Sequence, residues 1–185
     1  MIPTAGGAIV FTDIVGFTQL TDQHGDDAAV ALLELQDSVV HAALPADSRV
    51  VKELGDGLLL WFADARAAVE TSIDLQWRFA QQSTTSGIPL WVRIGLHWGN
   101  PRRRGDDIIG RDVNLTSRIA ALAGPGEVLC TDTAAGAAGT IDRVTFVPLG
   151  PVFVKGIVEP IPLLRVVGDA GDPRRDGPAT DRRST

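Results

Sequence analysis

Cysteine is nearly absent from this chain, whose 185 residues include only Cys130. A single thiol excludes an internal disulfide, which fits a reducing compartment. Long apolar runs are missing as well, since no stretch approaches the roughly 20 residues that a membrane helix needs. The N-terminus also lacks the basic region and apolar run of a secretory signal. We therefore expect a cytoplasmic protein with no membrane segment in this chain.

An excess of positive charge is also missing. The formal net charge is −6 and the pI is about 4.9, whereas proteins that bind long nucleic acids present a basic surface. We therefore expect no nucleic-acid partner, although a few local Lys and Arg residues can hold a small anionic substrate. Histidine is scarce, and His24, His41 and His97 lack the spacing of metal ligands, so we interpret all three as structural.

The remaining composition is that of an ordinary globular domain, with 44% hydrophobic and 22% charged residues. The length is sufficient for one domain with a substantial core. After Gly168 the chain becomes polar, with two Arg-Arg pairs among Gly, Pro, Asp and Ser. We predict one domain over residues 1–168 and a disordered tail over residues 169–185.

Hydrophobic periodicity predicts the order β-α-β-β-α-β, followed by a further helix and more strands. Strands are predicted over residues 8–13, 49–54, 58–62, 90–98, 127–131, 142–147, 151–154 and 161–167. Helices are predicted after residue 16, over 26–43, over 64–82, and from Asp112 or Asn114 to about 123. Gln36 belongs to the periodic stripe of the second of these helices. A polar loop is predicted at 100–107. We expect an α+β fold, a ferredoxin-like βαββαβ core with additional C-terminal αβ elements, whose helices cover one face of a largely antiparallel sheet.

Two aspartates stand where strands end. Asp13 follows the first apolar strand, and Asp56 lies in a Gly-Asp-Gly hairpin turn. A strand order of this kind can bring both carboxylates to one edge of the sheet, where they would hold a hard cation such as Mg²⁺. Gly16-Phe17-Thr18 opens a helix just beyond Asp13, and its free N–H groups can cradle phosphate oxygens. A helix cap and an ordinary turn are the structural alternatives for the two aspartates.

Four sequence blocks carry a resemblance to a known family. In chain order they are Phe11–Thr18, Lys52–Asp56, Val92–Gly99 and Asp107–Arg118. Together they closely resemble the catalytic domain of class III nucleotidyl cyclases, over about residues 7 to 167. These enzymes make cyclic AMP or cyclic GMP from the corresponding triphosphate. The resemblance therefore implies the class III cyclase fold and a cyclase reaction.

The resemblance also implies a site with two metal ions, Mg²⁺ or Mn²⁺. Asp13 and Asp56 would bind both ions, with the Ile14 carbonyl as an additional ligand. One ion would lower the pKa of the substrate 3′-hydroxyl, which attacks the α-phosphate, and the other would neutralise the leaving pyrophosphate. Arg93 matches the family position that contacts phosphates, against the alternative of a strand residue that faces solvent.

The remaining family positions concern the base, the ribose and the phosphates. Lys52 and Asp107 match the base-selecting pair of adenylyl cyclases, because Lys can donate to adenine N1 and a carboxylate can accept from the N6 amine. Asn114 and Arg118 share one face of the predicted helix, and in the family they orient the ribose and stabilise charge on the α-phosphate. Lys155 resembles the Lys that contacts the β- and γ-phosphates. ATP is therefore the expected substrate.

The resemblance assigns these residues to two half-sites on different subunits. Asp13, Asp56 and Arg93 belong to one half, and the base, ribose and Lys155 positions to the other. A head-to-tail homodimer with two equivalent sites follows, and a monomer should be inactive. Only residues 100–106 separate Gly99 from Asp107, where many family members carry a longer arm that helps dimerisation.

Three alternative functions are less favoured. A guanylate cyclase typically has Glu where Lys52 stands. A catalytically silent nucleotide-binding module should lack some of the positions named above, and none is missing. A diguanylate cyclase needs a Gly-Gly-Asp/Glu-Glu-Phe signature, which this chain does not contain.

Overall fold

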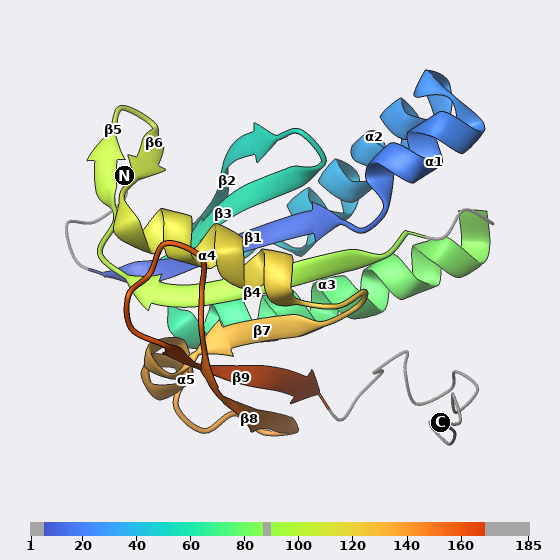
Figure 1. The fold of residues 1–185 in the computed structure, drawn as a ribbon. Helices are drawn as coiled ribbons and strands as arrows, with labels where there is room; N and C mark the ends of the chain where they lie inside the picture. The colour runs from blue at the N-terminus through green and yellow to red at the C-terminus, as the bar shows by residue number, and fades with distance from the viewer. Residues whose placement is uncertain (1–5, 87–89, 169–185) are drawn as a thin grey trace, which may run out of the picture.

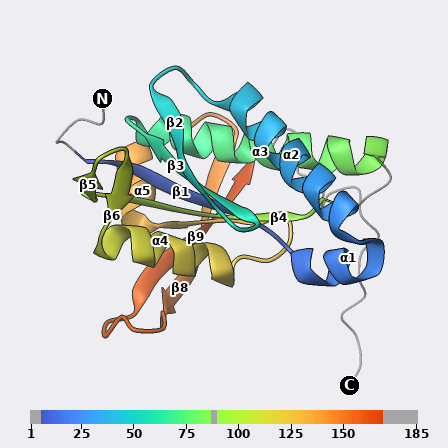
Figure 2. The same ribbon diagram turned by 90° about the horizontal axis from the view of Figure 1, so that it is seen from above.

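The computed structural model describes residues 6–86 and 90–168 (Figure 1). The predicted tail at residues 169–185 lies outside these residues, so the boundary at residue 168 stays a prediction. The described chain forms a twisted main sheet, a small separate hairpin and helices that pack against the sheet (Figures 1 and 2).

The main sheet holds seven strands within the described residues. In chain order they are β1 (Gly7–Ile14), β2 (Ser48–Leu54), β3 (Gly57–Phe62), β4 (Val92–Gly99), β7 (Val128–Thr131), β8 (Val144–Val152) and β9 (Ile161–Gly168). Their order across the sheet is β2-β3-β1-β4-β7-β9-β8. The β4–β7 pair is parallel and the other five pairs are antiparallel. The spatial order β2-β3-β1-β4 confirms the ferredoxin-like βαββαβ core, and β7, β9 and β8 extend it.

The helices lie on both faces of this sheet, so the prediction of one covered face is wrong. The helices are α1 (Phe17–His24), α2 (Asp26–Ala43), α3 (Ala65–Ser86), α4 (Arg111–Leu122) and α5 (Asp132–Ala138). Figure 2 shows α2 and α3 on one side of the sheet and α4 on the other. The uninterrupted apolar runs of β1 and β3 are the pattern of strands buried on both faces, whereas a strand with one covered face alternates, so the sequence did carry a signal for the second covered face.

The side chains of β1 show how the two faces are used. Ala8 and Val10 pack into the larger core, which includes residues of α2, α3 and α5. Ile9 and Phe11 point to the opposite face, where they join a cluster with residues of α4. Successive side chains of a strand alternate between faces, so the apolar run of β1 serves both cores.

Helix α4 approaches the sheet most closely at Gly95 of β4. A Cβ atom at this position would lie 2.3 Å from the backbone nitrogen of Ala120. The helix backbone therefore rests directly on β4, and only glycine leaves enough space. Because the helix is held this close on one side, its opposite side remains available for polar residues.

Three further details differ from the sequence predictions. The predicted polar loop at 100–107 contains a hairpin, in which β5 (Arg102–Arg104) pairs with β6 (Asp107–Ile109). Helix α5 was not predicted, because its short run of small residues shows no apolar periodicity, and Thr131 caps it through a bond from the Ala134 N–H. The two strands predicted at 142–147 and 151–154 form one strand, β8, with an irregular register between Pro148 and Gly150.

The length and apolarity of the helices bear on membrane insertion. None of the helices in the described part of the chain is both long and apolar enough to span a membrane.

Substitution of Gly95 tests the contact between α4 and β4. We expect Gly95→Ala to lower the free energy of unfolding by roughly 1–3 kcal/mol, because the added methyl group forces the helix away from the sheet. Gly136→Ala in α5 is the matched control, since a Cβ there meets nothing within 4 Å and should add about 0.5–1 kcal/mol. Urea unfolding followed by circular dichroism measures both. Equal stability of the two variants would contradict this packing.

Candidate active site

The structure brings Asp13 and Asp56 to the same edge of the sheet. Asp13 lies opposite Gly57 in the β1–β3 register, and Asp56 lies in the turn between β2 and β3. The Ile14 N–H donates to the Asp56 carbonyl oxygen at 3.1 Å. A Cβ at Gly57 would lie 2.4 Å from the Thr12 carbonyl oxygen. Glycine after Asp56 thus allows the turn to sit directly against the end of β1.

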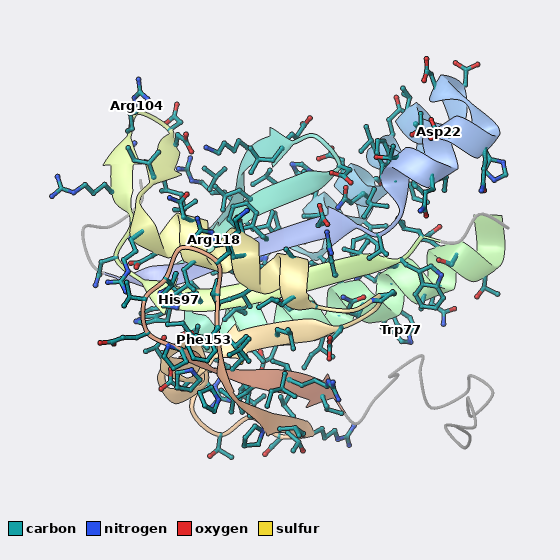
Figure 3. The ribbon with its side chains drawn as sticks, viewed as in Figure 1. Asp22, Trp77, His97, Arg104, Arg118 and Phe153 are labelled. Carbon is teal, nitrogen blue, oxygen red and sulfur yellow. The ribbon has the colours of Figure 1, made fainter. Side chains whose placement is uncertain are left out.

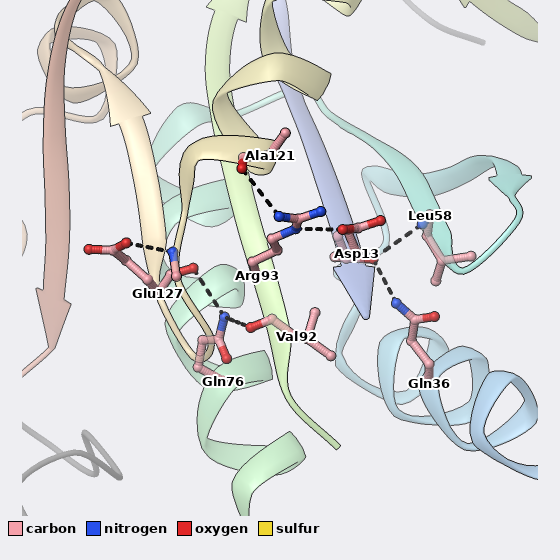
Figure 4. Close-up of polar contacts among 10 residues, drawn as sticks. Asp13, Gln36, Leu58, Gln76, Val92, Arg93, Ala121 and Glu127 are labelled. Carbon is pink, nitrogen blue, oxygen red and sulfur yellow. Dashed lines mark hydrogen bonds and ion pairs between the residues drawn. The ribbon is translucent and has the colours of Figure 1, made fainter. Parts of the chain in front are cut away.

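Arg93 completes this group from the other neighbour of β1. Its position in β4 is in register with Asp13, and its Nε lies 2.5 Å from Asp13 Oδ2 (Figure 4). Its Nη1 also donates to the Ala121 carbonyl at 3.2 Å, next to the end of α4. The guanidinium therefore holds one carboxylate and reaches the helix terminus at the same time.

Asp56 has an unfavourable electrostatic environment. Burial raises the pKa of its carboxyl above the ordinary value, and the negative charge of Asp13 raises it further. A hydrogen bond with its own backbone and the charge of Arg93 oppose these effects without cancelling them. The pair thus carries more negative charge than its surroundings neutralise, which is the electrostatic condition that a bound cation relieves.

The donor set fits a hard divalent cation. Across residues 6–86 and 90–168, no group of three or more His, Cys, Asp or Glu side chains gathers in one place. Two carboxylates alone suit Mg²⁺ or Mn²⁺, which keep several water or phosphate oxygens as ligands. The part played by the Ile14 carbonyl stays a prediction.

Lys52 and Asp107 form a second group on the face of the sheet that α4 covers. Lys52 is in register with Leu59, which packs in the α4-side cluster. Its Nζ lies 2.7 Å from Asp107 Oδ2, and both side chains are 34% exposed. This hydrogen bond is the main cause of a lowered pKa at the Asp107 carboxyl. A donor and an acceptor therefore stand side by side with their polar ends still accessible.

The β5–β6 hairpin positions Asp107. Ile108 is fully buried in the α4-side cluster, and Arg49 Nη2 donates to the Asp106 carbonyl at 2.6 Å. The triplet Arg102–Arg104 is exposed in β5. Three consecutive charged residues show no strand alternation, which is why the sequence predicted a loop here.

Asn114 and Arg118 line a pocket beside α4. The pocket has a volume of about 750 Å³, and its lining residues are Gly110, Arg111, Asn114, Arg118, Gly156, Ile157, Val158 and Glu159. Arg118 Nη1 donates to the Lys155 carbonyl oxygen, and Figure 3 shows Arg118 on α4 beside this segment. The exposed Lys155 is thus connected to the pocket through its backbone.

These groups remain separate within one chain. The pocket lining includes neither of the two aspartates nor Arg93. Arg93 contacts α4 at the Ala121 carbonyl, three residues beyond Arg118. Among the described residues, the acidic group, the Lys–Asp pair and the Asn–Arg pocket are thus three distinct groups, and the lining of the pocket contains no member of the other two.

Sequence reasoning missed a polar network that anchors the start of α4. His97 is 8% exposed, and its Nδ1 lies 3.0 Å from Thr131 Oγ1 while Nε2 lies 3.7 Å from Asp112 Oδ1. Burial lowers the pKa of His97 despite the nearby Asp112 carboxylate. Asp112 also accepts from the Asn100 N–H at 2.8 Å. The signal in the sequence was a His flanked by apolar strand residues, two positions before a glycine.

A comparison with sequence families decides the classification. Residues 4–164 match the family described as the adenylate and guanylate cyclase catalytic domain. The chain belongs to this cyclase family. The match covers nearly the whole described cyclase domain and confirms the class III resemblance.

Similar sequences include adenylate cyclases of two Streptomyces species. An adenylate cyclase of Streptomyces coelicolor is 33% identical over 128 residues, which cover 69% of this chain and 32% of the relative. One from Streptomyces griseus is 32% identical over 120 residues, 64% of this chain and 29% of the relative. The cyclase domain thus spans about a third of the length of these relatives.

Solved structures share the fold. The adenylyl cyclase CyaB from P. aeruginosa is similar with a TM-score of 0.76 and 27% identity, over 92% of this chain and 99% of the other. A Trypanosoma brucei adenylate cyclase in its monomeric state has a TM-score of 0.76 at 24% identity, over 89% of this chain and 90% of the other. This second similarity shows the fold alone.

Substitution of Asp56 tests the electrostatic repulsion in the acidic group. In the absence of divalent metal, we expect Asp56→Asn to raise the urea midpoint at pH 7, because it removes a partly buried charge beside Asp13. The pKa of the Asp56 carboxyl is higher in the folded state than in the unfolded state. The wild type therefore loses stability as the pH rises from the unfolded-state pKa through the folded-state pKa. The advantage of the variant should therefore shrink as the pH is lowered toward 4.

The control for this experiment is Asp22→Asn, an exposed carboxylate on α1, which should change stability by less than about 0.5 kcal/mol. Excess Mn²⁺ should then raise the Tm of the wild type and leave that of Asp56→Asn unchanged, because a metal that binds only the folded state stabilises it. A less stable Asp56→Asn protein at pH 7 would contradict the repulsion.

Proposed function

We propose that this domain is an adenylate cyclase, which converts ATP to 3′,5′-cyclic AMP and pyrophosphate at sites shared by two subunits of a head-to-tail homodimer. The observation that carries the choice of ATP is the contact of Lys52 with Asp107. The Lys donor and the carboxylate acceptor stand 2.7 Å apart. They can therefore pair with the N1 acceptor and the N6 donor of adenine, which are neighbours on the base. Guanine, held in the same orientation, presents a donor at N1 and an acceptor at O6 and is disfavoured.

The acidic group would hold the metal ions, Mg²⁺ or Mn²⁺, of the reaction. Asp13 and Asp56 are its carboxylate ligands in this proposal, and the Ile14 carbonyl is an additional ligand. Bound divalent ions supply a lowered pKa at the ribose 3′-hydroxyl and neutralise negative charge on the leaving pyrophosphate. Arg93 keeps Asp13 in place and offers its guanidinium to the phosphates.

The Asn–Arg pocket would receive the ribose and the α-phosphate. Arg118 uses one donor on the Lys155 carbonyl, and a guanidinium has five N–H donors, so others remain for a phosphate oxygen. Charge on the α-phosphate grows during in-line attack, so these donors act mainly in the transition state. Asn114, one turn earlier on α4, orients the ribose. Lys155 and the Gly16-Phe17-Thr18 backbone are further candidates for contacts to the triphosphate.

The separation of these groups in one chain supports a shared site. Asn114 and Arg118 face a pocket formed with the segment that follows β8, whereas the acidic group lies at the edge where β1 and the β2–β3 turn meet. A two-fold axis that places the pocket of one subunit against the acidic edge of the other would generate two identical sites. Each site would then take metal ligands from one chain and base, ribose and phosphate contacts from its partner.

A direct assay tests the reaction and its substrate. Purified protein is incubated with ATP or GTP in the presence of Mn²⁺, and cyclic products are separated by chromatography. We expect cyclic AMP, with kcat/KM for ATP at least about tenfold above that for GTP, because a site built for hydrogen bonds rejects a mismatched base strongly.

The matched variants for this assay lie next to each other on β2. Lys52→Glu should reduce the preference for ATP, and Glu53→Gln, which changes a neighbouring exposed charge on the other face of the strand, should preserve it. Faster conversion of GTP would establish a guanylate cyclase instead. Absence of any cyclic product from a proven dimer would exclude the enzyme.

Mixing of inactive variants tests the shared site. Asp13→Ala and Arg118→Ala should each be inactive, and co-expression should restore about a quarter of wild-type activity, because half of randomly formed dimers carry one intact site. Asp13→Ala mixed with Asp56→Ala is the control, since both changes lie in the same half and no intact site can form. Failure of rescue in heterodimers isolated with two affinity tags would refute the two-chain site.

A further inference from the structure

Gln36 is a polar residue in the buried stripe of α2. The other buried residues of this helix are Ala29, Leu32, Val39 and Val40, and Gln36 is as buried as they are, with 1% exposure. A buried amide must find hydrogen-bond partners, because an unpaired one is costly. An apolar residue would fill the same position without that requirement. The contacts of the Gln36 amide therefore indicate its role.

The amide of Gln36 reaches the strand that carries Asp13. Its Nε2 donates to Thr12 Oγ1 at 3.1 Å, and Thr12 is itself 1% exposed. The same hydroxyl oxygen accepts from the Leu58 N–H at 3.3 Å; Figure 4 shows the dashed lines that start from Gln36 and Leu58, beside Asp13. Thr12 directly precedes Asp13, and Leu58 lies two residues beyond Asp56. One side chain of α2 thus connects to both strands of the acidic group.

The packing around this contact leaves space beside the turn. A cavity of about 170 Å³ lies between α2 and the β2–β3 turn, with Gln36, Gly55 and Leu58 among its lining residues. Gly55 has a positive φ of 66° and no atom within 4 Å of an added Cβ. Side-chain packing is therefore sparse on this side of the turn, so polar contacts to β1 carry more of its positioning.

We propose that Gln36 is a positioning residue for the two aspartates: its amide fixes the Thr12 hydroxyl, and that hydroxyl holds the Leu58 backbone and thereby the turn that carries Asp56. The inference rests on the proposed function, because it assigns the acidic pair to metal binding. Two like charges repel, and a metal site requires them to stay close. Loss of the amide bond should let the turn move away from β1 and weaken metal binding before it weakens the fold.

The test uses variants that keep shape and remove one hydrogen-bonding group. Gln36→Leu preserves most of the buried volume, and Thr12→Val replaces the hydroxyl by a methyl group. Thr12→Ser retains the hydroxyl and should restore the wild-type behaviour that Thr12→Val loses. Ser72→Ala is the matched control, because Ser72 is 1% exposed on α3 and its hydroxyl donates within its own helix, to the Ala68 carbonyl.

Four measurements separate positioning from stability. Electron paramagnetic resonance of free Mn²⁺ gives the dissociation constant for the metal alone, and we expect it to rise roughly five- to tenfold in Gln36→Leu and Thr12→Val. Hydrogen exchange of the Leu58 amide, followed by NMR, should accelerate roughly tenfold in the same variants. The urea midpoint of Gln36→Leu should fall no further than that of Ser72→Ala. In the cyclase assay, the Mn²⁺ concentration for half-maximal rate should rise while the rate at saturating Mn²⁺ changes less than about threefold.

The outcomes distinguish this inference from the proposed function. Unchanged Mn²⁺ binding and unchanged Leu58 exchange in Gln36→Leu and Thr12→Val would overturn the inference even if the wild type makes cyclic AMP. An inactive wild type would refute the proposed function, and the binding and exchange measurements would still decide the role of Gln36. If Gln36→Leu does not fold, the comparison of Thr12→Val with Thr12→Ser decides it alone.

Discussion

The pairing of β1 with β3 on one side and with β4 on the other is the constraint on which the acidic site depends. This register places Asp13 opposite Gly57 in one neighbour and opposite Arg93 in the other. A shift of one residue would turn Asp13 to the opposite face of the sheet. The buried apolar residues of β1 prevent such a shift, because they fill two different cores. Hydrophobic packing on both faces thus fixes where a carboxylate stands.

Helix α4 has two roles that come from its two sides. Its inward side rests on β4 at Gly95 and shares apolar residues with clusters on β1 and β7. Its outward side presents Asn114 and Arg118 to the pocket. The close backbone contact makes the helix a rigid support for those two polar residues, and in its first turn Asp112 contacts the buried His97. Packing against the sheet and presentation of polar groups are consequences of the same placement.

Several elements could be predicted because local chemistry specifies them. Helix α2 has the predicted bounds, since its apolar period is regular and Pro45 follows its end. Asp64 caps α3 as predicted, accepting from the Ala67 N–H at 2.7 Å. The β5–β6 hairpin was missed because its three consecutive arginines show no strand alternation and distant contacts support it, such as Arg49 with the Asp106 carbonyl. Helix α5 was missed because its short run of small residues has no apolar period. The face covered by α4 was missed although β1 and β3 are apolar along most of their length, which is the pattern of strands buried on both faces.

The linear sequence specifies the residues of chemical interest and their order along the chain. It placed Asp13 at a strand end, Asp56 in a glycine turn, and Asn114 and Arg118 one helical turn apart, because strand, turn and helix patterns are local. Tertiary structure alone decided which of these residues meet. It joined Asp13 to Arg93 and Lys52 to Asp107 across 80 and 55 residues of chain, and it kept the Asn–Arg pocket apart from the aspartates. Those contacts depend on sheet register and on the close approach of α4, which arise only when the separated segments pack into shared cores.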